Sequence, residues 1–175
     1  MIAAGVDIID IGGESSRPGS QPLSLQEELD RVMPLVFGLR DLGVPLSIDT
    51  YKPFVMREAL AAGADMINDI NGFRGDGAWD AVAQSDCGLC IMHMQKTPTD
   101  MQQDPHYENV VQQVGDFLEE QVAQARQAGI DAERICIDPG FGFGKTLAHN
   151  TALFRETATL QHRLNLPLLV GVSRK

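Results

Sequence analysis

Six short apolar segments recur along this chain, and each ends on polar residues before a stretch of helical character begins. The segments cover residues 6–11, 44–48, 65–67, 88–91, 134–137 and 168–172. Regular alternation of strands and helices predicts a parallel sheet with right-handed crossovers. In such sheets ligands bind beyond the carboxyl ends of the strands, so the polar residues at these ends should converge on one site.

The predicted fold class is α/β, an incomplete (β/α)8 TIM barrel with about six of its eight β/α units. A dinucleotide-binding fold is the alternative, but it would need a glycine fingerprint that the sequence lacks. A complete barrel takes about 250 residues, whereas this sequence has 175, begins on what looks like the last turn of a helix and stops directly after the sixth strand. We therefore expect a single, partial barrel domain over residues 1–175 that lacks roughly the first and last strands.

Five helices are predicted between the strands from capping signals and hydrophobic periodicity. The first begins at Ser24 with a capping-box pattern, and Pro34 should kink or interrupt it. The second starts at Pro53, which suits the first turn of a helix. All five are expected over residues 25–39, 53–62, 78–85, 107–128 and 150–164.

The most unusual loop follows the fifth strand and reads DPGFGFGK over residues 138–145. Asp138 stands at the carboxyl end of that strand, and the alternating glycines allow the backbone to approach a ligand closely. The loop nearly matches a P-loop, but Pro139 occupies the position of the first required glycine, so this interpretation is disfavoured. A flexible loop with a solvated Asp138 is the alternative, and a solvated surface position explains Lys145 equally well.

The formal net charge of -10 disfavours nucleic acid and anionic membrane surfaces as partners. The three cysteines, Cys87, Cys90 and Cys136, indicate a reducing compartment and are expected to be small buried apolar residues. No apolar run approaches membrane-spanning length, and the first residues lack the basic flank of a signal peptide. The sequence predicts a cytoplasmic protein with no membrane or nucleic-acid partner.

Six motifs at the strand ends follow one another in order along the chain. They are DIGGESSRPG at residues 10–19, SIDT at 47–50, INDI at 67–70, MHM at 92–94, DPGFGFGK at 138–145 and SRK at 173–175. As a set they resemble the dihydropteroate synthase family, and the resemblance covers essentially the whole chain. It implies a (β/α)8 barrel that joins 6-hydroxymethyl-7,8-dihydropterin diphosphate to para-aminobenzoate in folate biosynthesis, releasing diphosphate and 7,8-dihydropteroate.

The resemblance also implies roles for individual residues. The implied pterin-binding residues are Asp49, Asn68, Ile70, Met92, Asp138 and Lys175, and the implied para-aminobenzoate-binding residues are Ser16, Arg17, Pro18 and Phe143. Asp49, Asp138, Arg17 and Lys175 are implied to be catalytic. The two carboxylates would stabilise positive charge that develops on the pterin, and Arg17 would hold the leaving diphosphate.

Magnesium as a cofactor, a homodimeric full-length protein and sensitivity of the family to sulfonamides follow from the same resemblance. The family's metal-binding asparagine belongs to its first strand and loop, and an arginine and a histidine of its anion pocket belong to its last strand. None of the three has a counterpart here, so no metal ligand is assigned. Ser16 stands where many relatives carry threonine.

Three other functions fit parts of the pattern. A non-catalytic pterin-binding fragment would bind without turnover, a pterin-dependent methyltransferase of the related barrel type is disfavoured by the loop around Arg17, and a Schiff-base aldolase would use Lys175. Some single residues also have structural explanations. Asp49 could cap the following helix, His93 could be a satisfied strand-end histidine, and residues 95–105, which include Met101, are predicted to form a mobile surface loop.

Overall fold

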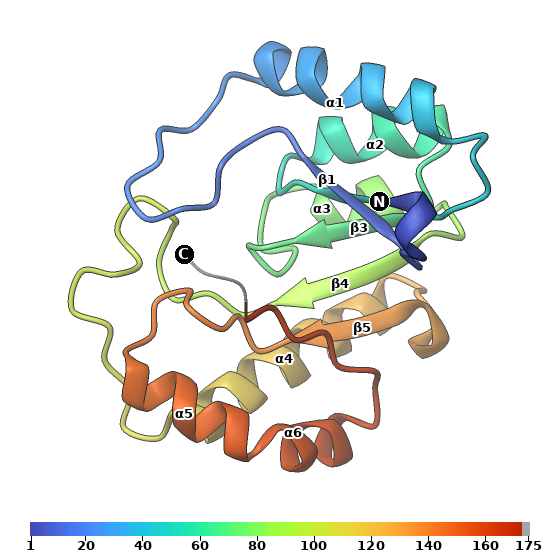
Figure 1. Cartoon of the computed structure of the whole chain (residues 1–175). Helices are drawn as coiled ribbons and strands as arrows, with labels where there is room; N and C mark the ends of the chain where they lie inside the picture. The colour runs from blue at the N-terminus through green and yellow to red at the C-terminus, as the bar shows by residue number, and fades with distance from the viewer. Residues whose placement is uncertain (173–175) are drawn as a thin grey trace.

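The fold is built on one parallel sheet, which the computed structural model describes within residues 1–172. Its strands are β1 (Ile9–Gly12), β2 (Leu46–Asp49), β3 (Met66–Asp69), β4 (Gly88–Met92) and β5 (Ile135–Asp138). They lie side by side in the order of the sequence, and every neighbouring pair is parallel. Figure 1 shows the strands in the middle of the molecule with helices outside them. This sequential parallel order confirms the predicted class, an incomplete (β/α)8 barrel.

The sixth predicted strand, residues 168–172, is the exception. Leu168 forms only an isolated bridge with Ile137, supported by two bonds: the Ile137 amide donates to the Pro167 carbonyl (3.0 Å), and the Leu169 amide donates to the Ile137 carbonyl (2.8 Å). The segment therefore starts to pair with β5 but does not extend into a ladder within the described residues. Its register next to β5 is nevertheless the one expected of the next barrel strand.

Side chains alternate across the strands, and this separates the core from the site. The outward-facing residues of β1 to β5 pack with the helices in the main core; they are Ile9, Ile11, Leu46, Ile48, Ile67, Leu89, Ile91, Ile135 and Ile137. Because successive strand residues point to opposite faces, the intervening residues face the concave side. A hollow of about 460 Å³ on that side is lined by Asp10, Ser47, Met66, Asn68 and Cys136, among others.

Helices α1 and α2 begin where the sequence signals predict. α1 (Leu25–Leu39) starts behind Ser24, whose side chain accepts a hydrogen bond from the Glu27 amide, and it continues through Pro34, so the predicted interruption is wrong. α2 (Pro53–Ala62) has the predicted bounds. α3 (Ala78–Val82) and α4 (Val110–Gln127) are shorter than predicted. Short 3₁₀ turns, η1 (Ile2–Ala4) and η2 (Ala132–Arg134), precede β1 and β5.

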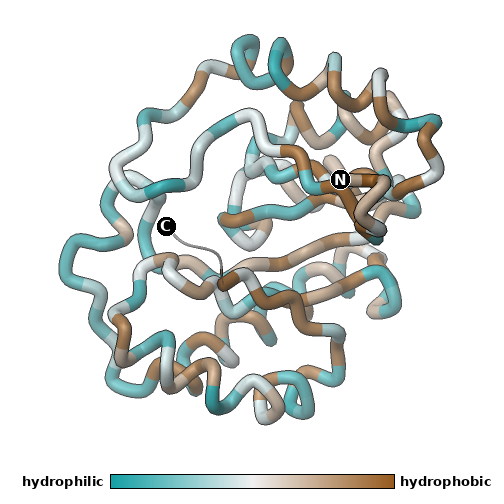
Figure 2. Tube along the Cα trace, in the orientation of Figure 1, coloured by the Kyte–Doolittle hydropathy of each residue, from teal (hydrophilic) through white to brown (hydrophobic). Residues whose placement is uncertain are grey.

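The predicted helix over residues 150–164 is two helices. α5 (Leu147–Arg155) starts earlier, capped by Thr146, and α6 (Thr157–Leu164) follows after a break at Glu156, whose ψ is 16°. Both pack against α4, as Figure 1 shows in its lower half. Figure 2 shows hydrophobic residues gathered in the strands, whereas the long loops after β1 and β4 are mostly hydrophilic. Of the helices in residues 1–172, none is long and apolar enough to cross a membrane.

Candidate active site

The strand register brings the predicted pterin-binding residues to one end of the sheet. Asp49 is paired with Asn68 on the neighbouring strand, and Met92 is paired with Asp138. Asp49 and Asp138 are the last residues of their strands, and all four side chains belong to the concave-face set. The expectation that the strand-end residues converge is therefore met for these four.

Asn68 presents a buried acceptor that lacks a protein partner. Its Oδ1 atom is one of two buried side-chain atoms in the described residues without a hydrogen bond, the other being Oε1 of Gln121 on α4. Its Nδ2 atom lies 3.5 Å from an Asp10 carboxylate oxygen, at the outer limit of a hydrogen bond. Since buried polar atoms are nearly always satisfied, this orphaned oxygen marks a place for a ligand donor. Asp10 was missed in the sequence, although its position two residues before the end of β1 puts it on the same face.

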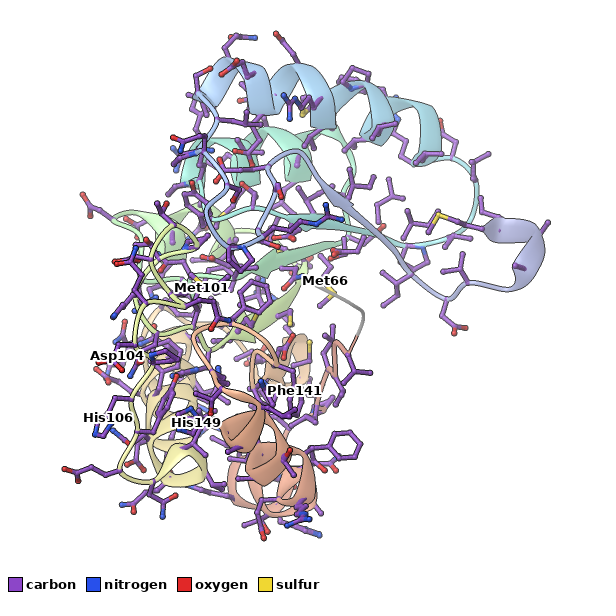
Figure 3. The ribbon with its side chains drawn as sticks, turned by 60° about the vertical axis from the view of Figure 1, so that its left-hand side comes forward. Met66, Met101, Asp104, His106, Phe141 and His149 are labelled. Carbon is purple, nitrogen blue, oxygen red and sulfur yellow. The ribbon has the colours of Figure 1, made fainter. Side chains whose placement is uncertain are left out.

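An apolar cluster borders these polar groups. It consists of Ile70, Met92, Met94, Met101 and Phe143, with Tyr51 packed against it, and we call it the strand-end cluster. The structure thus brings together three predicted ligand-binding residues from three different strand ends. Met101 is fully buried, so its prediction as part of a mobile surface loop is wrong; Figure 3 shows it facing into the molecule. Hydrophobic contact with the other strand ends, which no local sequence signal encodes, overrides the polarity of its neighbours.

The loop between β1 and α1 carries the predicted para-aminobenzoate residues. Ser16 lines a small pocket together with Asp49 and Ile70. Arg17 and Pro18 are exposed on the same loop, and within residues 1–172 the Arg17 guanidinium makes no hydrogen bond or ion pair. The structure therefore brings Ser16 together with two of the predicted pterin-binding residues but leaves Arg17 and Pro18 exposed on the loop.

A buried ion-pair network holds the base of this loop. Lys52 donates to Glu14 (2.6 Å) and to Glu28, the Tyr51 hydroxyl donates to Glu14 (2.6 Å), and the Thr50 hydroxyl donates to Glu28 (2.6 Å). Burial alone would raise the pKa of Glu14 and lower that of Lys52, but the hydrogen bonds between them outweigh it, so the Glu14 pKa is lowered and the Lys52 pKa raised. Burial, followed by the bond to Glu14, raises the pKa of Tyr51 to about 12. Both charges are thus maintained at neutral pH. Because these residues are far apart in the sequence, no local sequence pattern could have predicted this network.

The glycine loop after β5 is packed and hydrogen-bonded. Asp138 is buried, and one of its carboxylate oxygens accepts a bond from the Gly140 amide (2.7 Å). The Gly142 amide donates to Asn150 (2.9 Å), and the Gly144 carbonyl accepts a bond from the Tyr107 hydroxyl (2.9 Å). The alternative of a flexible loop with a solvated Asp138 is therefore wrong. Lys145 is also buried, at 3% exposure, and not solvated.

Two predicted features have no structural outcome. Lys175, and with it the motif SRK, lies outside the described residues. For the magnesium prediction, residues 1–172 contain no group of three or more His, Cys, Asp or Glu side chains that could hold a metal ion.

Carboxylates, an amide and an apolar cluster at the carboxyl ends of parallel barrel strands are the arrangement that barrel enzymes use for their sites. Residues 1–175 match the family described as pterin binding enzyme, and the chain belongs to this family.

The chain is also similar to known dihydropteroate synthases, both in sequence and in solved structures. The chain is 48% identical over 176 residues to dihydropteroate synthase of Escherichia coli (strain K12), covering 100% of this chain and 62% of that protein. It is 45% identical over 177 residues to the enzyme of Neisseria meningitidis serogroup C, with the same two coverages of 100% and 62%. The fold matches Yersinia pestis dihydropteroate synthase in a sulfonamide drug complex with a TM-score of 0.96 and 46% identity, covering 99% of this chain and 63% of that one. The match to the Burkholderia cenocepacia enzyme complexed with 7,8-dihydropteroate has a TM-score of 0.90 and 56% identity, with coverages of 99% and 64%. The chain thus spans about 62% of the length of the curated relatives it matches, in agreement with the predicted partial barrel.

Proposed function

We propose that the protein containing this sequence condenses 6-hydroxymethyl-7,8-dihydropterin diphosphate with para-aminobenzoate, giving 7,8-dihydropteroate and diphosphate. The observation that carries the proposal is the orphaned oxygen of Asn68, a concave-face residue paired with Asp49 on the neighbouring strand. A pterin is flat and carries amide-like donors along one edge, so a row of acceptors beside apolar side chains suits it. The dihydropteroate complex of the Burkholderia cenocepacia relative supports the same assignment.

In this proposal Asp49, Asn68 and Asp138 hydrogen-bond the edge of the pterin, while Met92 and Ile70 pack against its face. Lys175 is assigned to the same ring by resemblance. The acceptors come from strand ends, which are rigid compared with loops, so the ring would be held in one orientation. The strand-end cluster would keep water from the reacting atoms.

The reaction breaks the bond between the pterin methylene carbon and the diphosphate oxygen, whose electron pair leaves with diphosphate. The amine nitrogen of para-aminobenzoate supplies the pair for the new carbon–nitrogen bond and then loses a proton. Positive charge develops on the pterin as the old bond breaks, and the carboxylates of Asp49 and Asp138 would stabilise it in a site of low dielectric constant. No covalent enzyme intermediate is required.

Arg17, Ser16, Pro18 and Phe143 are assigned to the other half of the reaction. The Arg17 guanidinium has no protein partner in the described structure and stands on a loop beside the site, so it is available to hold diphosphate. Phe143 belongs to the strand-end cluster and offers a ring for the aromatic substrate to pack against. Ser16 offers a hydroxyl close to Asp49.

Magnesium, homodimer formation and a cytoplasmic location are part of the proposal by family resemblance alone.

The test is formation of 7,8-dihydropteroate and diphosphate from both substrates in the presence of magnesium, using the full protein. We expect turnover in the wild type and a loss of roughly 100-fold or more in kcat/KM in Asp138→Asn, which retains the shape but not the charge. Pterin binding without turnover would favour the non-catalytic alternative. Methyl transfer from a pterin, or borohydride trapping of a carbonyl substrate on Lys175, would contradict the proposal.

A further inference from the structure

We propose that Lys145 and His93 form a buried lock that fixes the glycine loop, residues 139–144, and through it positions Phe143 for the aromatic substrate. The inference rests on the proposed function because it deepens the role of Phe143. It assigns Lys145 and His93 as positioning residues that contact no substrate.

Lys145 forms hydrogen bonds with His93 and with the backbone of the glycine loop. Its ammonium lies 2.9 Å from three acceptors, which are Nδ1 of His93 and the carbonyl oxygens of Gly140 and Phe143. A fourth oxygen, the His93 carbonyl, lies at 3.3 Å. Three is the number of hydrogen bonds that an ammonium can donate. Lys145 is only 3% exposed, and its ammonium is buried against the loop backbone.

The contact with Lys145 depends on the protonation state of His93. Nδ1 can accept from an ammonium only if the imidazole is neutral and its proton is on Nε2. Burial, followed by the charges of Lys145 and Arg74, lowers the pKa of His93 to about 2, so the ring stays neutral at physiological pH. The Phe117 ring meets the imidazole edge-on at a centroid distance of 5.0 Å and restrains its rotation. His93 is therefore a fixed acceptor and not an acid or base.

Lys145 also holds a turn within the glycine loop. The Phe143 amide donates to the Gly140 carbonyl (3.1 Å), which closes a turn, and Lys145 binds the carbonyls at both ends of that turn. Gly140 has a φ of +70°, and a Cβ atom there would lie 1.9 Å from the His93 carbonyl oxygen. The loop therefore packs directly against the backbone that follows β4, and only a glycine at position 140 permits this contact.

The turn positions the side chain of Phe143. The Phe143 side chain is 8% exposed and packs in the strand-end cluster with Met92 and Ile70, the residues assigned to the pterin face. Asp138 has further anchors, because it is part of β5 and its carbonyl accepts a bond from the His93 backbone amide (2.9 Å), which the side-chain substitutions retain; only its carboxylate is bonded to the loop, at the Gly140 amide (2.7 Å). Releasing the lock should therefore displace Phe143 more than Asp138, which predicts separate effects on the two substrates.

The test compares four variants of the full protein. Lys145→Met removes the donor, and His93→Leu removes the acceptor. His93→Asn retains an acceptor, since Oδ1 of asparagine can take the place of Nδ1. Lys96→Met is the matched control, because Lys96 is an exposed loop lysine whose ammonium donates to the single carbonyl of Gln103.

Three quantities are measured on each variant: amide hydrogen exchange of residues 139–146, the Kd of a pterin, and the KM of para-aminobenzoate. In Lys145→Met and His93→Leu we expect faster exchange in the loop, a KM raised roughly 10- to 100-fold, and a pterin Kd changed less than about 3-fold. His93→Asn and Lys96→Met should stay within about 3-fold of wild type in all three.

Unchanged exchange in both Lys145→Met and His93→Leu would overturn the lock. Faster exchange with an unchanged KM would overturn its link to Phe143, and so would failure of His93→Asn to restore the KM. A wild type that binds neither substrate would instead refute the proposed function, whereas the exchange data need no substrate and judge the lock independently.

Discussion

The ammonium of Lys52 lies 2.6 Å from a carboxylate oxygen of Glu14, which ties the loop after β1 to the loop after β2. The same ammonium binds Glu28, whose side chain is only 1% exposed. The loop after β1 carries Arg17 and Pro18 at the rim of the site. Anchoring at its base is therefore a condition for placing these residues near a ligand.

We predict that Lys52→Met destabilises the protein by roughly 3 kcal/mol, because it leaves the Glu28 carboxylate buried without its cation. Denaturant unfolding measures the change. The control is Asp41→Asn, which removes an exposed pair with Arg40 (3.7 Å), leaves the Arg40 bond to the Ala62 carbonyl in place and should cost less than about 1 kcal/mol. Equal effects of the two substitutions would show that the network contributes no more than a surface ion pair.

The orphaned oxygen of Asn68 gives a prediction for binding. Asn68→Ala should weaken pterin binding by roughly 10-fold or more, since a ligand donor loses its acceptor, while the free energy of unfolding falls by less than about 1 kcal/mol. Calorimetric titration measures the affinity. Gln121→Ala is the matched control because Gln121 on α4 has the other orphaned oxygen but lies outside the site. A similar loss of affinity in both variants would contradict the assignment of Asn68.

Gly140 and Gly129 have similar φ angles but different space around them, so alanine substitutions at the two positions distinguish backbone strain from a steric clash. Gly140 has a φ of +70° and no room for a Cβ atom, whereas Gly129 has a φ of +82° with nothing within 4 Å of an added Cβ. Gly129→Ala should cost about 1 kcal/mol for the left-handed backbone alone. Gly140→Ala should cost about 3 kcal/mol or more, because the loop must also leave the His93 carbonyl. Thermal unfolding of the two variants measures the difference, and similar melting temperatures would argue against the packed glycine loop.

The pH dependence of stability follows from His93. Its pKa is lowered to about 2 in the folded protein, whereas an unfolded histidine titrates near 6.5. Between these values the unfolded chain binds the additional proton, so this contribution to stability is complete above pH 6.5 and is lost as the pH falls. Relative to His93→Asn, wild type should lose up to about 1.4 kcal/mol per pH unit below pH 6.5.

Chemical denaturation at pH 7.5, 6.0 and 5.0 would measure that difference. The carboxyl of Asp69, whose pKa burial raises to about 7, titrates in both proteins and should cancel from the comparison. A constant difference across this range would mean that His93 is not held neutral.

The features that the sequence predicted well are local ones. Apolar runs that end on polar residues identified β1 to β5 and predicted that the strand-end residues converge, and the strand register makes Asp49 and Asn68 neighbours. The capping box at Ser24 gave the start of α1 and Pro53 gave the start of α2, since both signals act within a few residues.

The features that were missed depend on distant contacts. Lys145 and His93 are 52 positions apart in the sequence, so no local pattern could distinguish a buried lysine from a solvated one. The break between α5 and α6 at Glu156 also has no proline or glycine to announce it. Burial of Met101 depends on packing against residues from several other strand ends. Tertiary contacts decided each of these cases.

The most direct test of the central claim is a calorimetric titration of the full protein with 6-hydroxymethylpterin, repeated on Asp49→Asn and Asp138→Asn. We expect one pterin per chain in the wild type and a loss of affinity of roughly 10-fold or more in each variant, because both carboxylates accept hydrogen bonds from the ring edge in the proposed complex. Absence of saturable binding in the wild type, or equal affinity in all three proteins, would contradict a pterin site at the carboxyl ends of these strands.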